Sequence, residues 1–547
     1  MNISARRSRA KHVGLFFQLP GSRLLCALLA SLQVLLPSLA AALPSEGHVA
    51  AGQATIQQVS PTTLSIAQAS DKAILNWNSF SIAASEAVHF IQPSISSIAL
   101  NRVVGVDPSV ILGQLQANGR IFLINPNGIL FGAGAQINVG GLLATTLQTR
   151  DDDFMAGRYL FAQDPLKGLK TVVNRGTIHV SDNGYVVLMA PGVSNEGVIV
   201  ANLGTALLGS GQKFTLDLMG DGLIHYAIND KVLGQVTGPD GKPLISAVSN
   251  SGTIQADGGQ VILSARASGD VFSSVVNQSG VIRAQSLVNR DGIVRLEGGD
   301  TGVVQMAGTI DASGLSSDQK GGQVSVLGQH VALLDQAKVD VSGDAGGGTA
   351  LVGGNYQGKG PESNAERTLV QSGVSINADA RTSGDGGKVI VWADGDTRYA
   401  GVISAQGGAT SGNGGFVEVS GKNALDFHGA VDVAAPKGVG GRVLLDPQDI
   451  LLNTTVQPSP PNNPNGTPDV AFADPPAVGT YTVQIADVTG FSELFLQATR
   501  DITAANPVTM GAGNSIRLEA NNNISVNAGA NVTVSGVGSI QLRADAD

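Results

Sequence analysis

A short pattern recurs along this chain about every 28 residues, and it limits the fold more than any other feature. The copies read NRGTIHV, NEGVIVA, NSGTIQA, NQSGVIRA, MAGTIDA, YAGVISA and HGAVDVA. Each places one apolar residue among small and polar neighbours, and these central residues are Ile178, Ile199, Ile254, Ile282, Ile310, Val339, Ile376, Ile403 and Val431. From the third of them onward the steps are 28, 28, 29, 37, 27 and 28 residues. So even a spacing predicts stacked repeats.

Two or three short strands in each repeat are typical of a coil of a parallel β-helix. Val and Ile then point inward and stack on the neighbouring coils, while Asn and Gly turn the corners. The chain has 72 Gly and only 14% charged residues, which suits many short strands and turns. The long step contains GGGTALVGGNYQGKGPESNAER, which we expect to be a loop insertion. A globular β-sandwich is the alternative, but it would not require even spacing. The sequence therefore predicts an all-β parallel β-helix, a solenoid.

Residues 1–42 have the character of a secretory signal peptide. Four basic residues precede the apolar run LLCALLASLQVLLPSLAAALP, and small residues lead to an expected cleavage after Ala42. The alternative is a membrane anchor. Cys26, the only cysteine, lies in this segment, so the mature chain would hold no disulfide. Removing five basic residues changes the net charge from −10 to −15, which disfavours nucleic acid and anionic lipid as partners.

The repeats are interrupted near the C-terminus. Residues 457–480 contain seven prolines and no repeat, which indicates a linker or loop because proline cannot donate to a strand ladder. Repeat-like sequence resumes in 481–547 and stops at Asp547 in mid-pattern. We expect that the natural protein continues or that this sequence is a fragment.

One tetrapeptide occurs twice in different settings. Asn125-Pro126-Asn127-Gly128 separates the apolar runs IFLI and ILF, and it predicts a strand, a tight turn and a second strand. The same four residues at Asn463–Gly466 lie in the Pro-rich segment without flanking strands. The tetrapeptide by itself is therefore only a turn, and any special role at Asn125 depends on its surroundings. The flanking runs are expected to supply core in the folded state, or else a strand that binds a partner.

The region from residue 43 to about 300 resembles the secretion domain of filamentous haemagglutinin-like exoproteins, the passengers of two-partner secretion in Gram-negative bacteria. The resemblance rests on NWNSF, NRV, SVILG and NPNGI, in this order and spacing. It implies that the export motif comprises Asn76, Trp77, Asn78, Asn101, Arg102, Asn125, Pro126, Asn127 and Gly128. It also implies a right-handed β-helix with an N-terminal cap, whose partner is an outer-membrane β-barrel transporter with periplasmic recognition domains. Folding would follow outside the cell, so the chain would be secreted or surface-exposed.

The expected domains are a signal peptide at 1–42, a secretion domain at 43–300 and a β-helix stalk at 301–456, which resembles the stalks of large adhesins. The Pro-rich linker at 457–480 and the further repeats at 481–547 follow. We expect the function of an adhesin, with cell-surface receptors or glycans as partners. The alternative is the delivery stalk of a contact-dependent inhibition toxin whose effector is absent here.

A polysaccharide-active enzyme is the third alternative, because parallel β-helices also carry such sites. It would need clustered carboxylates on one face. The run Asp151–Asp153 is the densest acidic one, and we interpret it as a solvated loop. The seven histidines have no metal-ligand spacing, and His89 is expected to be a packed strand residue. Trp77 and Trp392 are expected to stack between coils. We predict neither enzyme activity nor a cofactor.

Overall fold

The computed structural model describes residues 43–218, 224–268, 271–287, 290–454, 482–488 and 490–545. The predicted signal peptide at 1–42 and the predicted Pro-rich linker at 457–480 lie outside these residues. Among the residues described, no helix has the length and apolar character needed to cross a membrane.

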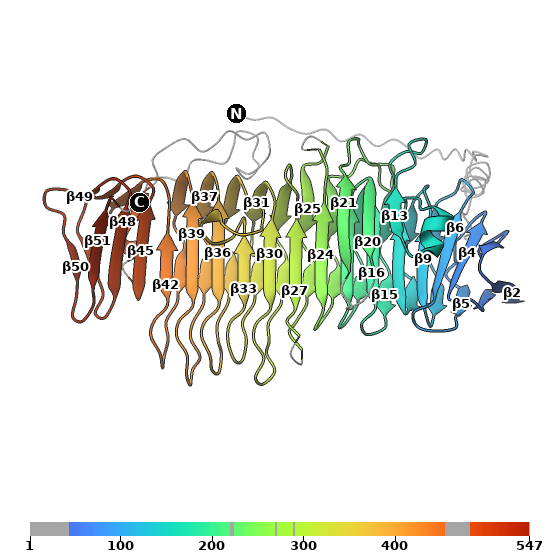
Figure 1. The fold of residues 1–547 in the computed structure, drawn as a ribbon, viewed down its shortest axis with the longest axis horizontal. Helices are drawn as coiled ribbons and strands as arrows, with labels where there is room; N and C mark the ends of the chain where they lie inside the picture. Colours follow the sequence, from blue (N-terminus) through green and yellow to red (C-terminus); the bar gives the residue numbers. More distant parts are fainter. Residues whose placement is uncertain are drawn as a thin grey trace, which may run out of the picture. The chain divides into compact units, whose positions relative to one another are not determined.

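Three long sheets run through the described chain (Figure 1). The first sheet has 17 strands, and these are β1 His48–Ala51, β4 Lys72–Trp77, β6 Ile98–Val103, β9 Arg120–Ile124, β12 Gly141–Thr145, β16 Tyr185–Ala190, β19 Thr205–Ser210, β24 Gln260–Ala265, β27 Ile293–Glu297, β30 Gln323–Leu327, β33 Thr349–Val352, β36 Lys388–Ala393, β39 Phe416–Gly421, β42 Arg442–Leu445, β45 Glu493–Ala498, β48 Ser515–Ala520 and β51 Ile540–Ala544.

The second sheet has 15 strands, and these are β7 Ser109–Ile111, β10 Ile129–Phe131, β14 Thr171–Asn174, β17 Gly192–Asn195, β22 Ser246–Asn250, β25 Ser274–Gln278, β28 Val303–Met306, β31 His330–Leu333, β34 Arg367–Val370, β37 Asp396–Tyr399, β40 Ala424–Phe427, β43 Ile450–Asn453, β44 Thr482–Gln484, β46 Ile502–Ala504 and β49 Ile524–Val526.

The third sheet has 14 strands, and these are β2 Ala54–Ser60, β3 Thr63–Gln68, β5 Ala87–Ile91, β8 Gln114–Ala117, β11 Gln136–Val139, β15 Thr177–Val180, β18 Val198–Val200, β23 Thr253–Gln255, β26 Val281–Arg283, β29 Thr309–Asp311, β32 Lys338–Asp340, β35 Ser375–Asn377, β38 Val402–Ser404 and β41 Ala430–Asp432.

Each coil takes one strand from each sheet, as β9, β10 and β11 do before β12 returns to lie beside β9. The pairings within the three sheets are parallel except at the start of the chain. There β1 pairs antiparallel with β4, and β2 pairs antiparallel with β3. These two strands cover edges that would otherwise be open to another chain. The predicted parallel β-helix with an N-terminal cap is confirmed.

The predicted repeat fixes the register of the third sheet. Ile178 pairs with Ile199, and the column continues through the other central residues in order to Val431. The first eight are at most 1% exposed, and Val431 is half-buried. One apolar side chain per coil therefore stacks directly on the next, as the spacing predicts.

Two insertions cover the outer face of the first sheet. The strands β13 Tyr159–Ala162, β20 Lys213–Asp217 and β21 His225–Asp230 form a small antiparallel sheet, next to helix α2 Asp151–Met155. Phe122, Phe154, Phe161 and Phe214 pack beneath it in a second apolar cluster. The repeat pattern did not predict this layer, because its strands lie between repeats.

The expected loop insertion in the long step is partly wrong. Residues Thr349–Val352 form β33, which pairs with β30 and β36, because the apolar stretch TALV completes the first-sheet ladder between those strands. The true insertion is residues 353–366, which include the 3-10 turn η1 Tyr356–Gly358. We call this insertion the strap. The remaining described elements are the pair β47 Val508–Met510 and β50 Val532–Val534, and the short helix α3 Ile485–Val488.

Candidate functional site

The three blocks of the expected export motif meet at one corner of three successive coils. They follow or end β4, β6 and β9, which are neighbours in the first sheet. In register, Leu75 lies beside Asn101 and Asn101 beside Leu123. The ends of these strands therefore stack, and we call residues 76–78, 101–108 and 125–128 the motif corner.

The turn of the motif corner is built around Asn125, which is fully buried. Its Oδ1 accepts a hydrogen bond of 2.9 Å from the backbone N–H of Asn127, and its carbonyl accepts one of 3.1 Å from the N–H of Gly128. Gly128 has a φ of +114°, a conformation that L side chains rarely adopt. Pro126 is buried between them. The predicted strand, turn and strand are confirmed, and the two strands belong to different sheets.

The apolar runs on both sides of this turn lie in the core. Ile121 and Leu123 point into the main core together with Ile129 and Phe131, while Phe122 packs into the outer cluster. Each of these side chains is at most 2% exposed. The runs therefore supply core in the folded state, as the first of the two expectations has it.

Amide side chains tie the third coil of the corner to the second. Asn125 Nδ2 donates to the carbonyl of Asp107 and to Ser109 Oγ, both at 3.0 Å. Asn127 Nδ2 donates to the carbonyl of Gly105 at 3.0 Å. A Cβ at Gly105 would lie 2.1 Å from the carbonyl oxygen of Asn78, so glycine allows the second coil to approach the first. The turn residues thus hold three coils together.

Trp77 and Asn101 form the buried part of the corner. Trp77 is 1% exposed, and its Nε1–H donates to Asn101 Oδ1 at 3.0 Å. Its ring also packs edge-on against Phe80 with centroids 5.6 Å apart. Asn101 Nδ2 reaches the carbonyl of Phe122 on the next coil at 3.4 Å. Leaving either partner unpaired here would cost about 1–3 kcal/mol.

Arg102 connects the motif corner to helix α2. Its guanidinium contacts Asp151 Oδ1 at 2.6 Å and donates to the carbonyl of Thr149 at 2.9 Å. At the other end of the helix, Lys72 Nζ donates to the carbonyl of Phe154 at 3.1 Å, and burial lowers the pKa of this amine. A cation is favourable at that end because the carbonyls there have no intrahelical partners.

The interpretation of Asp151–Asp153 as a solvated loop is wrong. The run forms the first turn of α2, where acidic side chains are stabilised by the helix dipole. Asp151 is held by Arg102, and Asp153 forms an ion pair of 2.7 Å with Arg158. The run is therefore a helix start docked onto the coils.

Two motif residues contribute less to the corner. Asn78 is exposed, and its backbone N–H donates to the carbonyl of Ser45 at 3.1 Å. Asn76 is half-buried, and its Oδ1 has no hydrogen-bond partner among the residues described. The structure gives these two side chains no role in holding the coils together.

The other residues singled out in the sequence lie in the scaffold. His89 is a half-buried strand residue of β5. Trp392 is 3% exposed in an outer apolar cluster with Leu351 and Ile390, and its Nε1–H donates to Asp394 at 3.0 Å. Across the described ranges, no group of three His, Cys, Asp or Glu side chains could hold a metal ion.

A buried amide ladder was not predicted from the sequence. Asn174 Nδ2 donates to Asn195 Oδ1 at 2.8 Å, Asn195 Nδ2 to Asn250 Oδ1 at 2.7 Å, and Asn250 Nδ2 to Gln278 Oε1 at 2.7 Å. All four side chains are fully buried. The recurring Asn at the start of the repeats was the available signal, but the fourth copy starts at Asn277, whereas the ladder uses the next residue.

Two buried carboxylates lie under the strap. The backbone N–H of Gln357 faces both oxygens of Glu418 at 3.1 and 3.2 Å, and its side chain donates to Gln497 at 2.8 Å. Burial raises the pKa of Glu418 to about 8 and that of Asp446 to about 6. These groups fasten the strap over the outer face and are isolated from any cleft with a nucleophile or metal.

Comparison with known proteins places this geometry in a family. A family model described as the TPS secretion domain, for two-partner secretion, matches residues 40–312. The crystal structure of the HMW1 secretion domain from Haemophilus influenzae is 33% identical, with a TM-score of 0.62, and the match covers 72% of this chain and 99% of that one.

Two heme/hemopexin-binding proteins of Haemophilus influenzae are also similar. One is 31% identical over 312 residues, which are 55% of this chain and 32% of that protein. The other is 30% identical over 274 residues, which are 46% of this chain and 28% of that protein. The chain spans about a third of the length of these relatives. With the family model and the secretion-domain structure in agreement, the chain belongs to the TPS secretion domain family and is an exoprotein of two-partner secretion.

Proposed function

We propose that the motif corner is the element through which this chain is exported. In this proposal an outer-membrane transporter with periplasmic recognition domains binds the unfolded chain. The corner residues then organise the first coils as the chain emerges outside the cell. The exported β-helix serves as a secreted or surface-exposed adhesin, with later coils as its stalk.

The observation that carries the proposal is the convergence of three separate motif blocks. Residues 76–78, 101–108 and 125–128 stack on consecutive coils, and Asn125 and Asn127 reach back to the second coil through bonds of 3.0 Å. Forming the first non-local strands is entropically costly, and a pre-set turn with cross-coil bonds lowers that cost. Side chains that end up in the core can bind a transporter only before folding, which fits an exported chain.

The proposal is tested with the two copies of the tetrapeptide. Pro126→Ala and Asn127→Ala should sharply reduce export, whereas Pro464→Ala and Asn465→Ala should leave it nearly unchanged. Loss of turn preorganisation alone costs on the order of 1 kcal/mol at either copy. The readout is the ratio of extracellular to periplasmic protein in a strain that carries the transporter. Equal export of all four variants would remove the special role of the motif corner.

The two relatives suggest a second candidate, the binding of haem or of a haem carrier. The sequence match to them supports it, but that match covers at most 32% of either protein. It coincides largely with the family region at 40–312, so a shared export route explains the similarity equally well. Titration of the exported protein with haem and with hemopexin distinguishes the two cases, since export alone predicts no binding of either ligand.

A further inference from the structure

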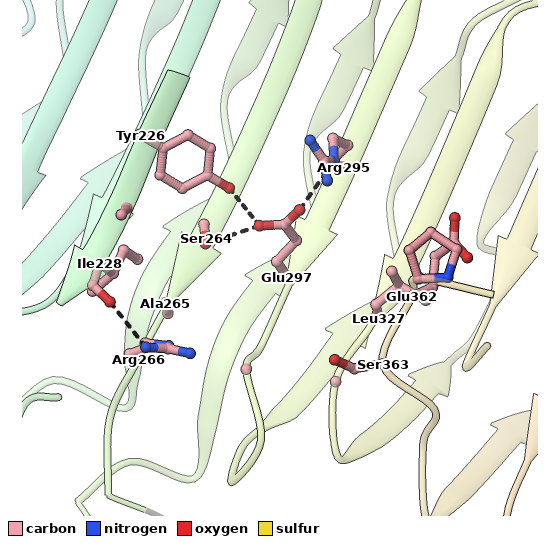
Figure 2. A pocket seen from close by; sticks show the side chains of 14 residues that line it. Tyr226, Ile228, Ser264, Ala265, Arg266, Arg295, Glu297, Leu327, Glu362 and Ser363 are labelled. Carbon is pink, nitrogen blue, oxygen red and sulfur yellow. Dashed lines mark hydrogen bonds and ion pairs between the residues drawn. The ribbon is translucent and has the colours of Figure 1, made fainter. Parts of the chain in front are cut away.

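An outer groove crosses the first sheet between its two insertions (Figure 2). Its floor is made by Ser264 of β24, Arg295 and Glu297 of β27, and Leu327 of β30. One wall is β21, and the other is the strap at residues 361–363. The groove has a volume of about 470 Å³, and a second hollow of about 550 Å³ continues it, with Gly299 and Ser363 lining both.

The polar groups of the floor are held in fixed positions. The carboxylate of Glu297 accepts hydrogen bonds from the Tyr226 hydroxyl and, at 3.2 Å, from Ser264 Oγ. Its other oxygen lies 3.0 Å from Arg295 Nε. The side chain of Arg295 is 48% exposed, so further N–H donors face the groove beside the remaining lone pairs of Glu297. A rigid donor and a rigid acceptor thus lie side by side.

The lining excludes several classes of ligand. Among the described lining residues there is no His, Cys or Met, and the Tyr226 hydroxyl is engaged, so the groove offers no ligand for haem iron. An extended peptide would need the free edge of β21, but Arg266 Nη1 already donates to the carbonyl of Ile228 at 3.0 Å. The two hollows carry three arginines and six carboxylates, a net charge of −3, which disfavours sulfated or sialylated chains.

We propose that the outer groove binds a neutral oligosaccharide. Each sugar hydroxyl both donates and accepts hydrogen bonds, so it fits the paired Arg295 and Glu297. The floor spans neighbouring coils at the regular strand spacing, and the second hollow extends it, so a linear chain can lie along it. This inference gives the proposed adhesive role a class of ligand. It is tested on exported, purified protein, so a failure to bind leaves the export proposal intact.

The chain contains a matched control for the floor. The tripeptide Arg-Leu-Glu occurs at 295–297 and again at 517–519, on β27 and β48 of the same sheet, and both copies form an ion pair between Arg and Glu. The second copy lies outside both hollows, where Arg517 stacks on Phe495 with 4.6 Å between its guanidinium carbon and the ring centroid. Equivalent changes at the two copies separate groove chemistry from ion-pair chemistry.

The experiment is isothermal titration of the exported full chain with short linear oligomers of glucose, galactose and mannose, and in parallel with heparin oligomers and a lysine-rich peptide. We expect one neutral class to bind with a Kd of about 1 mM or tighter. Arg295→Gln and Glu297→Gln should weaken it at least about tenfold, while Arg517→Gln and Glu519→Gln should stay within about twofold. Ser363→Trp should also abolish binding, because it blocks the exposed wall without altering the sheet.

The proposal is overturned if no neutral oligomer binds, or if heparin or the basic peptide binds in its place. It is also overturned if the two Arg-Leu-Glu copies respond alike. Thermal unfolding of each variant shows whether it has folded, and Ser363→Trp decides the question if the floor variants have not.

Discussion

Replacing Asn195 by Ala should destabilise the coils around β17 far more than an ordinary Asn→Ala change. Asn195 is the second member of the amide ladder and is fully buried. The substitution removes the acceptor of Asn174 Nδ2 and the donor to Asn250 Oδ1, which now lie at 2.8 and 2.7 Å. Both groups would remain buried without these partners.

The structure sets the magnitude of this loss. An orphaned buried polar group costs about 1–3 kcal/mol, so two of them predict a loss of about 2–6 kcal/mol. The matched control is Asn277→Ala, because repeat alignment places Asn277 in the ladder whereas the structure places Gln278 there. Asn277 is half-buried on the other side of β25, so its loss should stay within about 0.5 kcal/mol.

The assay is native-state hydrogen exchange of peptides that contain β17 and β22, since a stack of coils can open locally without unfolding as a whole. The opening free energy should fall strongly for Asn195→Ala and barely for Asn277→Ala. A loss below about 1 kcal/mol for Asn195→Ala, or an equal loss for both variants, would refute the argument that the ladder stabilises the coils.

Two further predictions concern the inner column and the strap. Ile282→Asp would bury an unpaired charge between Ile254 and Ile310, costing several kcal/mol, so limited proteolysis should cut the neighbouring coils; unchanged resistance would contradict the inward position of Ile282. Burial raises the pKa of Glu418 from 4.5 to about 8, so the folded state holds a proton that the unfolded chain releases, and the stability present at low pH is lost as pH rises through that window. Hydrogen exchange in the strap should therefore be faster at about pH 9 than at about pH 5, and Glu418→Gln should remove most of the difference; equal exchange in the native protein would count against it.

The constant spacing predicted the third-sheet column because each coil repeats the same inward position. It could not predict the amide ladder in full, since the fourth copy begins one residue early relative to the column. The layer made by β13, β20 and β21 was missed for a different reason. Its strands pair only with one another, so they have no counterpart in the repeat.

The motif corner was predictable as a set of residues but not as a geometry. The resemblance indicated Asn101, Arg102 and Asn127, and the structure shows which coil each one contacts. The contact between Arg102 and Asp151 joins residues 49 positions apart, and that between Lys72 and Phe154 joins residues 82 apart. Neither pair shares a helix face or a strand register, so sequence patterns carry no signal for them.

The most direct test of the role of the motif corner is the order in which coils form. Pulse-labelling hydrogen exchange on the refolding mature chain would report when each strand becomes protected. If the corner organises the first coils, the amides of β6, β9 and β12 become protected before those of β30, β36 and β39, and Asn127→Ala delays all of them. Simultaneous protection of both groups, or an unchanged order and rate in Asn127→Ala, would contradict this account.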